Sequence, residues 1–452
     1  MASNDIFEKE SVSSAIIKLA IPTIVSSLVT VIYNLADTYF VGLLNDPVQT
    51  AAVTLAAPAL LAFNAINNLF GVGTSSAMSR ALGRGDSNLV RRCSVFGLYC
   101  AFISSVLFSV FTGLFRTPLL GLLGASAKNA AATSEYMRWA VTCGAVPSIL
   151  NVVFAFLVRS EGSSLHASIG TMSGCILNII LDPIFIFGYL GFPAMGVAGA
   201  AIATVCGQIS GLFIYIFYYH KKKDSILLQI SLKGFSPRIQ IIRQLYTVGI
   251  PSSIMIALPS ILISSLNSML VRFSSVHVAV LGIYYKLQTF IYLPSGGIVQ
   301  GMRPIVGFNY GAGEMDRVKK TLDLSLVFTA AIMLVGTLLS LIIPEQLLLM
   351  FNANEETLKI GIPALRIISL GFLISSFGVI YSGAFEALGK GLSSLIISLL
   401  RQLVIILPLS GLLIPLIGPT GVWITLPIAE SIASAISILL IRRTLRKLKH
   451  SI

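Results

Sequence analysis

Asp37 and Asp182 are the two residues whose chemistry fits their surroundings least, because each lies in a long apolar stretch. Asp37 lies in Ile16–Leu44, where Lys18 is the only other charged residue, and Asp182 is the only one in Leu165–Tyr189. A carboxylate at membrane depth costs about 2.5–3.5 kcal/mol to insert, so it requires a partner, a water-filled cavity or a proton. The two residues therefore indicate a route for an ion or proton through a membrane protein.

Other oxygen-bearing side chains share the depth of these carboxylates. At a rise of 1.5 Å per residue, Asp37 and Asp182 lie about 10 Å from the outer ends of their expected helices, and Thr204 about 12 Å from the outer end of the next one. Tyr33 and Asn178 lie one turn below the carboxylates, since residues i and i+4 stack on one helix face. The sequence therefore predicts an oxygen-rich site for Na⁺ or for a proton shared between like charges.

The elements that position these residues are expected to be transmembrane helices. The chain has 452 residues, a mean hydropathy of +0.89 and only 11 % charged residues, whereas a soluble protein carries roughly a quarter. Twelve apolar stretches are long enough to span a bilayer. They cover approximately Ala15–Leu43, Ala51–Ser79, Cys93–Phe115, Ser134–Val158, Leu165–Tyr189, Gly196–Tyr219, Leu245–Phe273, Val278–Gly301, Leu322–Ile343, Leu358–Phe385, Leu392–Leu413 and Gly421–Ile441.

The net charge of +13 is interpreted as a topology signal. Most of the 31 Lys and Arg residues lie in alternate loops that share one side. Positively charged loops stay in the cytoplasm, so both termini are expected there. The basic tail Arg442–Lys449 is interpreted as an orientation anchor in preference to a lipid-binding switch.

The sequence repeats itself around one polar segment, His220–Gln244. The expected organisation is a six-helix lobe at 1–219, a cytoplasmic linker at 220–244 and a second six-helix lobe at 245–452. An even number of helices per lobe predicts a pseudo-two-fold axis along the membrane normal, with alternating access between the lobes. A duplicated channel or scaffold is the alternative. Residues paired by the repeat include Pro22 with Pro251, Arg138 with Arg366, Gly162 with Gly389, and Ala81–Arg92 with Asn309–Lys320.

The second lobe differs from the first in its charged residues. The repeat pairs Asp182 with Leu407, and Asp37 with Asn267 or Ser268, which predicts a single coupling site in the first lobe. Lys286 and Glu430 share a layer in the second lobe and are expected to form a polar pair, with Arg401 as a rival partner for Glu430. Both a structural and a transport role remain open for this pair. Arg159 and Glu386 are expected at cytoplasmic helix ends, where an inner gate and ordinary loop ion pairs are the two interpretations.

The substrate chamber is expected among apolar, aromatic and carboxamide residues of the spans, and plain helix packing is the other interpretation of these residues. The expected residues are Asn64, Phe63, Asn67, Asn151, Phe154, Tyr284 and Tyr292.

Several segments together resemble the multidrug and toxic compound extrusion (MATE) family, in particular its bacterial MepA-like and DinF-like exporters. The segments are Asn34–Gly42, Asn178–Gly188, Gly196–Gln208, Gly71–Gly73 with Ala81–Gly83, Gly301–Gly313 and Ile428–Ser431. The resemblance implies a two-lobed, twelve-helix antiporter that exports diverse lipophilic, often cationic, compounds. It also implies a location in the plasma membrane, the inner membrane of a bacterium. It also implies a cation site at Tyr33, Asp37, Asn178, Asp182 and Thr204.

The competing functions lack matching residues. A lipid or lipid-linked oligosaccharide flippase of related architecture, the main alternative, requires a more cationic cavity than these central charges indicate. A channel does not require deep carboxylates in one lobe only. The sequence contains no arrangement of His, Ser or Cys residues that would indicate an enzyme, and no GxxxxGK[ST] loop that would indicate a primary pump. The five cysteines are interpreted as packing residues. We expect no cofactor beyond H⁺ or Na⁺, no metal beyond Na⁺ at Asp37, Asp182 and Asn178, no nucleic-acid partner, and a monomer.

Overall fold

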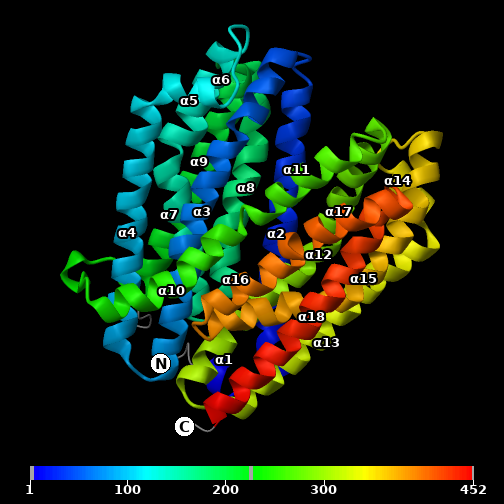
Figure 1. Cartoon of the computed structure of the whole chain (residues 1–452). Coiled ribbons are helices and arrows are strands. Elements are labelled where there is room, and N and C mark those ends of the chain that lie inside the picture. Colours follow the sequence, from blue (N-terminus) through cyan, green and yellow to red (C-terminus); the bar gives the residue numbers. More distant parts are fainter. Residues whose placement is uncertain (1–4, 223–227, 450–452) are drawn as a thin grey trace. The chain divides into compact units, whose positions relative to one another are not determined.

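The computed structural model describes residues 5–222 and 228–449, and no β-strand occurs among them. Residues 223–227 of the expected linker lie outside this part. The helices of the first half are α1 (Asp5–Glu8), α2 (Val12–Gly42), α3 (Pro47–Gly83), α4 (Ser87–Leu114), α5 (Arg116–Leu122), α6 (Ala130–Met137), a π-helix at Arg138–Cys143, α7 (Ala145–Ser160), α8 (Ser164–Phe187), a short 3₁₀ turn at Tyr189–Gly191, and α9 (Gly196–Lys222) (Figure 1).

The second half begins with a 3₁₀ turn at Leu232–Gly234 and has the same helical character. Its helices are α10 (Ile239–Met255), α11 (Leu258–Leu270), α12 (Ser275–Gly311), α13 (Met315–Ile342), α14 (Pro344–Leu349), α15 (Glu355–Ala387), α16 (Gly391–Leu399), a π-helix at Leu400–Val404, α17 (Ile406–Ile417) and α18 (Thr420–Lys449).

The predicted all-helical membrane fold is confirmed. Within the described residues, eleven helices are long and apolar enough to cross a membrane, and a twelfth span results if Ala130–Cys143 and Ala145–Ser160 count together. These two segments meet at a bend of 44°. The π-helix at Arg138–Cys143 lies directly before this bend, and such interruptions of the regular ladder are a common cause of bends.

The chain forms two compact units. Unit 1 contains Met1–Lys9 and Val25–Ser253, and unit 2 contains Glu10–Ile24 and Ile254–Ile452. The first part of α2 therefore belongs to unit 2, and all but the end of α10 belongs to unit 1. The units thus exchange the beginnings of their first long helices, whereas the sequence repeat divides the chain at residues 220–244.

Residues that are paired by the sequence repeat lie close to the two points where the chain passes from one unit to the other. Pro22 and Pro251 each lie a few residues before the point where the chain changes unit, and a helical proline removes one backbone hydrogen bond. In unit 1 a Cβ on Gly73 would lie 2.6 Å from the carbonyl oxygen of Leu245 in α10. In unit 2 a Cβ on Gly301 would lie 2.8 Å from the backbone nitrogen of Ala20 in α2. Glycine thus permits both close helix contacts.

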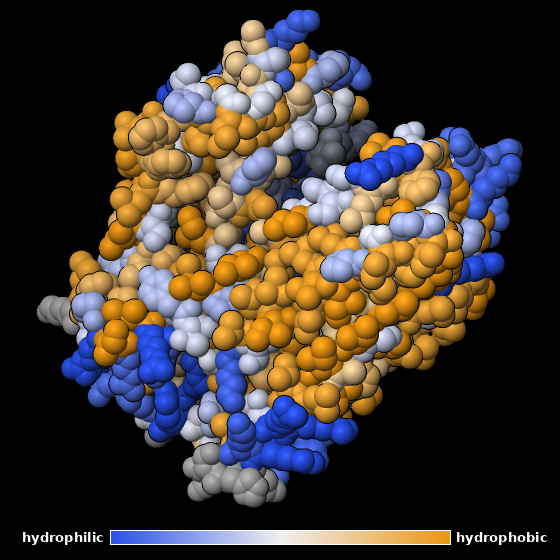
Figure 2. Space-filling view, viewed as in Figure 1, coloured by the Kyte–Doolittle hydropathy of each residue, from blue (hydrophilic) through white to orange (hydrophobic). Residues whose placement is uncertain are grey.

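The outer surface of unit 2 is largely apolar. In unit 2, α13, α15 and α18 pack together, and large apolar side chains on them are exposed, including Val335, Leu370 and Leu439. Figure 2 shows this surface as a broad hydrophobic area bordered by hydrophilic residues near the C-terminus. A contiguous apolar surface of this kind is suited to lipid and not to water.

Candidate functional site

The close packing of α8 on α9 positions the predicted polar site of unit 1. A Cβ on Gly174 would lie 2.6 Å from the carbonyl oxygen of Gly207, and one on Gly207 would lie 2.5 Å from the carbonyl oxygen of Gly174. Only glycine allows the two backbones to approach this closely. One turn beyond Gly174, Asn178 therefore faces the α9 residue Thr204.

The hydrogen bonds of the site centre on Thr204. Asn178 Nδ2 donates to Thr204 Oγ1 at 3.2 Å, and the hydroxyl of Tyr33 on α2 is 3.3 Å from the same oxygen. The structure therefore joins α2, α8 and α9 at three of the five predicted coupling residues. The depth count placed Thr204 level with the carboxylates, whereas its bonds are to Tyr33 and Asn178, the two residues expected one turn below them.

The two carboxylates lie beside these hydrogen bonds without partners of their own. Asp182 is fully buried, and neither of its carboxylate oxygens meets the geometry of a hydrogen bond with any described residue, although Asn178 lies near enough to interact with it. Asp37 is partly exposed, but its Oδ1 is buried and has no hydrogen-bond partner among the residues that the structure describes. The carboxylates are close enough to interact electrostatically. Buried charged oxygens without donors are costly unless a cation or a proton satisfies them.

Tyr136 on α6 is a member of the site that the sequence analysis missed. This side chain is 8 % exposed and interacts electrostatically with Asp37 and Asp182. The depth count did not include Tyr136, because the expected span begins at Ser134 and places this residue next to its end. The helix begins at Ala130 instead, so Tyr136 lies more than one turn inside it.

The oxygen atoms of this site fit a monovalent cation or a proton. Asn178 Oδ1 is also buried without a partner among the described residues, so acceptors without donors gather here from α2 and α8. Hard cations prefer carboxylate, carbonyl and hydroxyl oxygens. A proton would satisfy one carboxylate and remove the repulsion from the other. The donor set is therefore compatible with both Na⁺ and H⁺.

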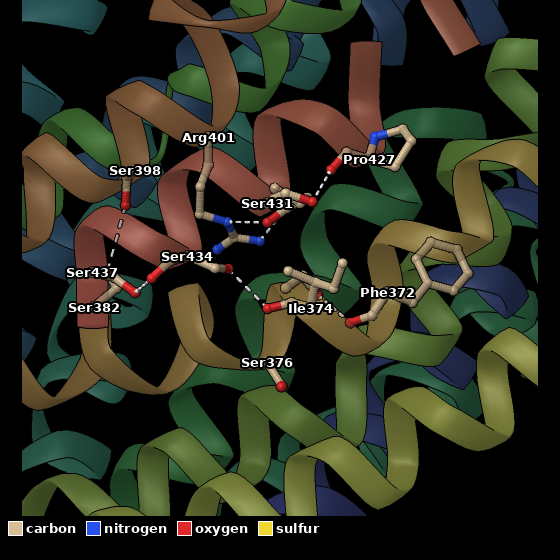
Figure 3. Close-up of polar contacts among 12 residues, drawn as sticks. Phe372, Ile374, Ser376, Ser382, Ser398, Arg401, Pro427, Ser431, Ser434 and Ser437 are labelled. Atoms are coloured by element: carbon tan, nitrogen blue, oxygen red, sulfur yellow. Dashed lines mark hydrogen bonds and ion pairs between the residues drawn. The ribbon is translucent and has the colours of Figure 1, made fainter. Parts of the chain in front are cut away.

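Unit 2 contains a different charged arrangement, an ion pair between Arg401 and Glu430. Arg401 Nε and Nη2 donate to the two carboxylate oxygens of Glu430 at 2.8 and 2.9 Å. Figure 3 shows Arg401 pointing toward the helix that carries Ser431. Arg401 lies in the π-helix before α17, and Gly378 on α15 leaves room for its side chain, because a Cβ there would lie 2.8 Å from Arg401 Cδ. A bidentate pair of this geometry is among the strongest charge-assisted contacts.

Lys286 does not join this pair. Its side chain is exposed, and it forms no ion pair with any residue that the structure describes. Of the two partners considered for Glu430, the structure thus selects Arg401.

The ion pair borders a cavity of about 400 Å³ within unit 2. Tyr284 and Tyr292, two of the predicted chamber residues, line this cavity with Arg401 and Glu430. Tyr284 stacks on Phe372 with ring centroids 6.3 Å apart, and Tyr292 donates to Ser375 Oγ at 2.7 Å. The cavity therefore has aromatic walls, and the two charges that line it, on Arg401 and Glu430, neutralise each other.

The remaining chamber candidates belong to unit 1. Among them, Asn67 Nδ2 donates to Asn64 Oδ1 at 3.3 Å, and Asn151 donates to Gln208 on α9. Gln208 lies one turn beyond Thr204, so the i, i+4 rule could have identified it. Phe154 is buried and stacks on Tyr215, which is helix packing. Phe63 is half-buried.

The residues of the expected inner gate lie in different units. Arg159 is a buried residue near the end of α7 in unit 1. Glu386 lies in unit 2, where it forms an ion pair with Arg303 on α12. A gate between Arg159 and Glu386 stays a prediction.

The sequence profile of the MatE family matches residues 22–184 and 251–412, one match in each half of the chain. The chain belongs to the MatE family. The predicted family resemblance is thereby confirmed, and the two matches reproduce the internal repeat.

Curated relatives and solved structures of this family align along nearly the whole chain. The multidrug export protein MepA of Staphylococcus aureus (strain MSSA476) is 28 % identical over 435 residues, which cover 96 % of this chain and 94 % of the relative. MepA of Staphylococcus haemolyticus (strain JCSC1435) is also 28 % identical, with the same coverage.

The solved structures extend this similarity to three dimensions. An outward-facing multidrug resistance MATE family transporter has a TM-score of 0.91 and 27 % identity, and a MATE crystal structure in the bent conformation has 0.92 and 28 %. Each alignment covers 100 % of this chain and 99 % of the other. A transporter from Pyrococcus furiosus, described as having a binding pocket of reverse polarity, has a TM-score of 0.90 and 27 % identity, with 99 % of both chains covered.

Proposed function

We propose that this protein is an antiporter that exports diverse lipophilic, often cationic, compounds across a bacterial plasma membrane in exchange for H⁺ or Na⁺. The names of the relatives, which are multidrug export proteins, support the export of such compounds. The group of unpartnered buried oxygens on Asp37, Asp182 and Asn178 supports the coupling to a cation. This group is the observation that carries the proposal, because a static structural role would leave its charges uncompensated.

The coupling follows from charge. Two carboxylates within electrostatic range repel each other when both are ionised. An inward-moving cation that neutralises Asp37 or Asp182 removes this repulsion and lets α2, α8 and α9 repack. If the drug and the cation favour opposite conformations, each lowers the affinity for the other, as linkage requires. We favour the proton, since it neutralises a carboxylate without the several oxygen ligands that a bound metal cation needs.

The test is transport by the purified protein in proteoliposomes. Efflux of ethidium, a fluorescent lipophilic cation, is measured under a proton gradient alone, under a sodium gradient alone and without either. We expect one of the two gradients to drive transport well above the rate without a gradient. Equal rates under all three conditions would overturn the proposed coupling.

The proposed orientation has its own test. We propose that both termini and the segment 220–244 face the cytoplasm, because this segment is rich in Lys and Arg. A Ser231→Cys variant, made in a background without the native cysteines, should react with a membrane-impermeant maleimide only after the cells are opened. Labelling in intact cells would reverse the topology.

A further inference from the structure

A second cavity of unit 2, of about 490 Å³, lies between α13, α15 and α18, near the end of α18. Its apolar lining includes Leu322 and Ile441, which are each 2 % exposed, and Leu445. Its charged lining consists of Asp316, Lys319, Asp323, Arg442 and Arg446. The cavity thus combines an apolar interior with a rim of both charges.

The charged side chains of this rim are not paired with one another. None of the four ion pairs found among the described residues includes any of the five. Arg442 and Arg446 are one turn apart on α18, as Lys319 and Asp323 are on α13, so each helix presents its charges on one face. Both Asp323 and Arg442 interact electrostatically with Tyr381 on α15, which places opposite charges around one point of the cavity.

The position of the cavity suggests the source of a ligand. The cavity is lined by the last part of α18, and hydrophilic residues border the exposed apolar surface of unit 2 near the end of this helix (Figures 1 and 2). In a membrane protein such a border lies at the level of the lipid headgroups, where basic pockets between helices hold lipid phosphates. The apolar lining beneath the charges suits the start of acyl chains.

We propose that this cavity binds the headgroup of an aminophospholipid, phosphatidylethanolamine. The phosphate is held by Arg442, Arg446 and Lys319, and the ammonium group by Asp316 and Asp323. An anionic lipid without an amine, such as phosphatidylglycerol, is disfavoured because the two aspartates find no cation to pair with. The proposal requires only that these helices span a bilayer, so it stands apart from drug export and cation coupling.

The experiment is native mass spectrometry of the purified full chain after incubation with equal amounts of phosphatidylethanolamine and phosphatidylglycerol of identical acyl chains. We expect the wild type to retain phosphatidylethanolamine preferentially. The Lys319→Gln/Arg442→Gln variant should retain roughly tenfold less of it, since each basic residue near a lipid phosphate contributes substantially to binding. The matched control is Lys320→Gln/Arg443→Gln, which removes equal charge at neighbouring exposed positions outside the cavity lining and should bind like the wild type.

The acidic residues provide a second, conservative variant. Asp316→Asn/Asp323→Asn should abolish the preference for phosphatidylethanolamine over phosphatidylglycerol, and it decides the question if the basic variant does not fold. Soluble phosphorylethanolamine, added as a competitor, should displace the lipid only weakly. Equal losses in the two basic double variants, an unchanged preference in the acidic variant, or full displacement by the soluble competitor would each overturn the proposal.

Discussion

The deep charged groups of α2, α8 and α9 in unit 1 differ from those of the equivalent helices in unit 2 in whether they are paired. In unit 1 the carboxylates of Asp37 and Asp182 have no cationic partner among the described residues. In unit 2 the only deep carboxylate of the corresponding helices, Glu430, is paired in bidentate fashion with Arg401. The first arrangement leaves charge to be neutralised from outside, whereas the second neutralises its own charge.

The repeat locates this difference at specific positions of the sequence. The register that pairs Gly196 with Gly421 also pairs Thr204 with Ala429, and the register that pairs Asp182 with Leu407 pairs Asn178 with Leu403. Each polar member of the first site on these two helices is thus replaced by an apolar residue in the second half. The two halves therefore share a sequence repeat, while only the first has polar groups at these positions of the two helices.

The largest expected effect is on transport, from the unpaired carboxylates. Asp37→Asn and Asp182→Asn should each reduce gradient-driven ethidium efflux to the background of empty liposomes. An amide carries no negative charge, so the binding of a cation or proton can no longer change the charge at that position. Thermal unfolding should show Asp182→Asn to be at least as stable as the wild type, since it removes an unpaired buried charge. Glu356→Gln, a change at an exposed carboxylate on α15, is the control. Wild-type efflux in both aspartate variants would contradict the assigned role.

The next effect is on stability, from the paired carboxylate. Glu430→Gln and Arg401→Met should each destabilise the protein by about 3–5 kcal/mol, because each leaves a buried charge or polar group without its partner. The double variant should be less destabilised than the sum of the two, as measured by a double-mutant cycle of unfolding. Lys286→Met combined with Glu430→Gln serves as the control and should be additive. Coupling with Lys286 instead of Arg401 would mean that the pairing differs from the structure.

A smaller effect is expected from the helix contact that supports the site. Gly207→Ala should destabilise unit 1 by about 1–3 kcal/mol, because its Cβ would overlap the backbone of α8. The same variant should raise the cation concentration that gives half-maximal efflux. Gly411→Ala on α17 is the matched control, since a Cβ added there would meet nothing within 4 Å, and it should be neutral or slightly stabilising. Equal melting temperatures in the two variants would argue against tight α8–α9 packing.

The smallest effect is expected from the hydroxyl that joins the three helices. Thr204→Val keeps the shape of the side chain but removes the acceptor of Asn178 and the partner of Tyr33. A loss of about 1 kcal/mol is expected for such a hydrogen bond. The cation concentration that gives half-maximal efflux should therefore rise several-fold, with little change in the maximal rate. A maximal rate near zero would instead give Thr204 a direct role in coupling.

The sequence by itself determined the class of protein, the helices and the unequal distribution of deep carboxylates. Hydropathy marks the spans because the bilayer admits few charges, and the positions of Asp37, Asp182 and Thr204 along their helices define one layer. The repeat then identified which half lacks the carboxylates. These are one-dimensional quantities, and they can be counted along the chain.

Only the tertiary structure decided which groups within a layer meet. Depth does not specify the direction in which a side chain leaves its helix or which helix lies beside it. The sequence therefore favoured Lys286 as the partner of Glu430, whereas the structure pairs Glu430 with Arg401, which lies in the π-helix at Leu400–Val404 and has space beside Gly378. The start of α6 at Ala130, four residues before the expected start of the span, likewise places Tyr136 deeper than the sequence indicated, within electrostatic range of Asp37 and Asp182. The exchange of Glu10–Ile24 between units depends on contacts between residues distant in sequence, and no local pattern encodes it.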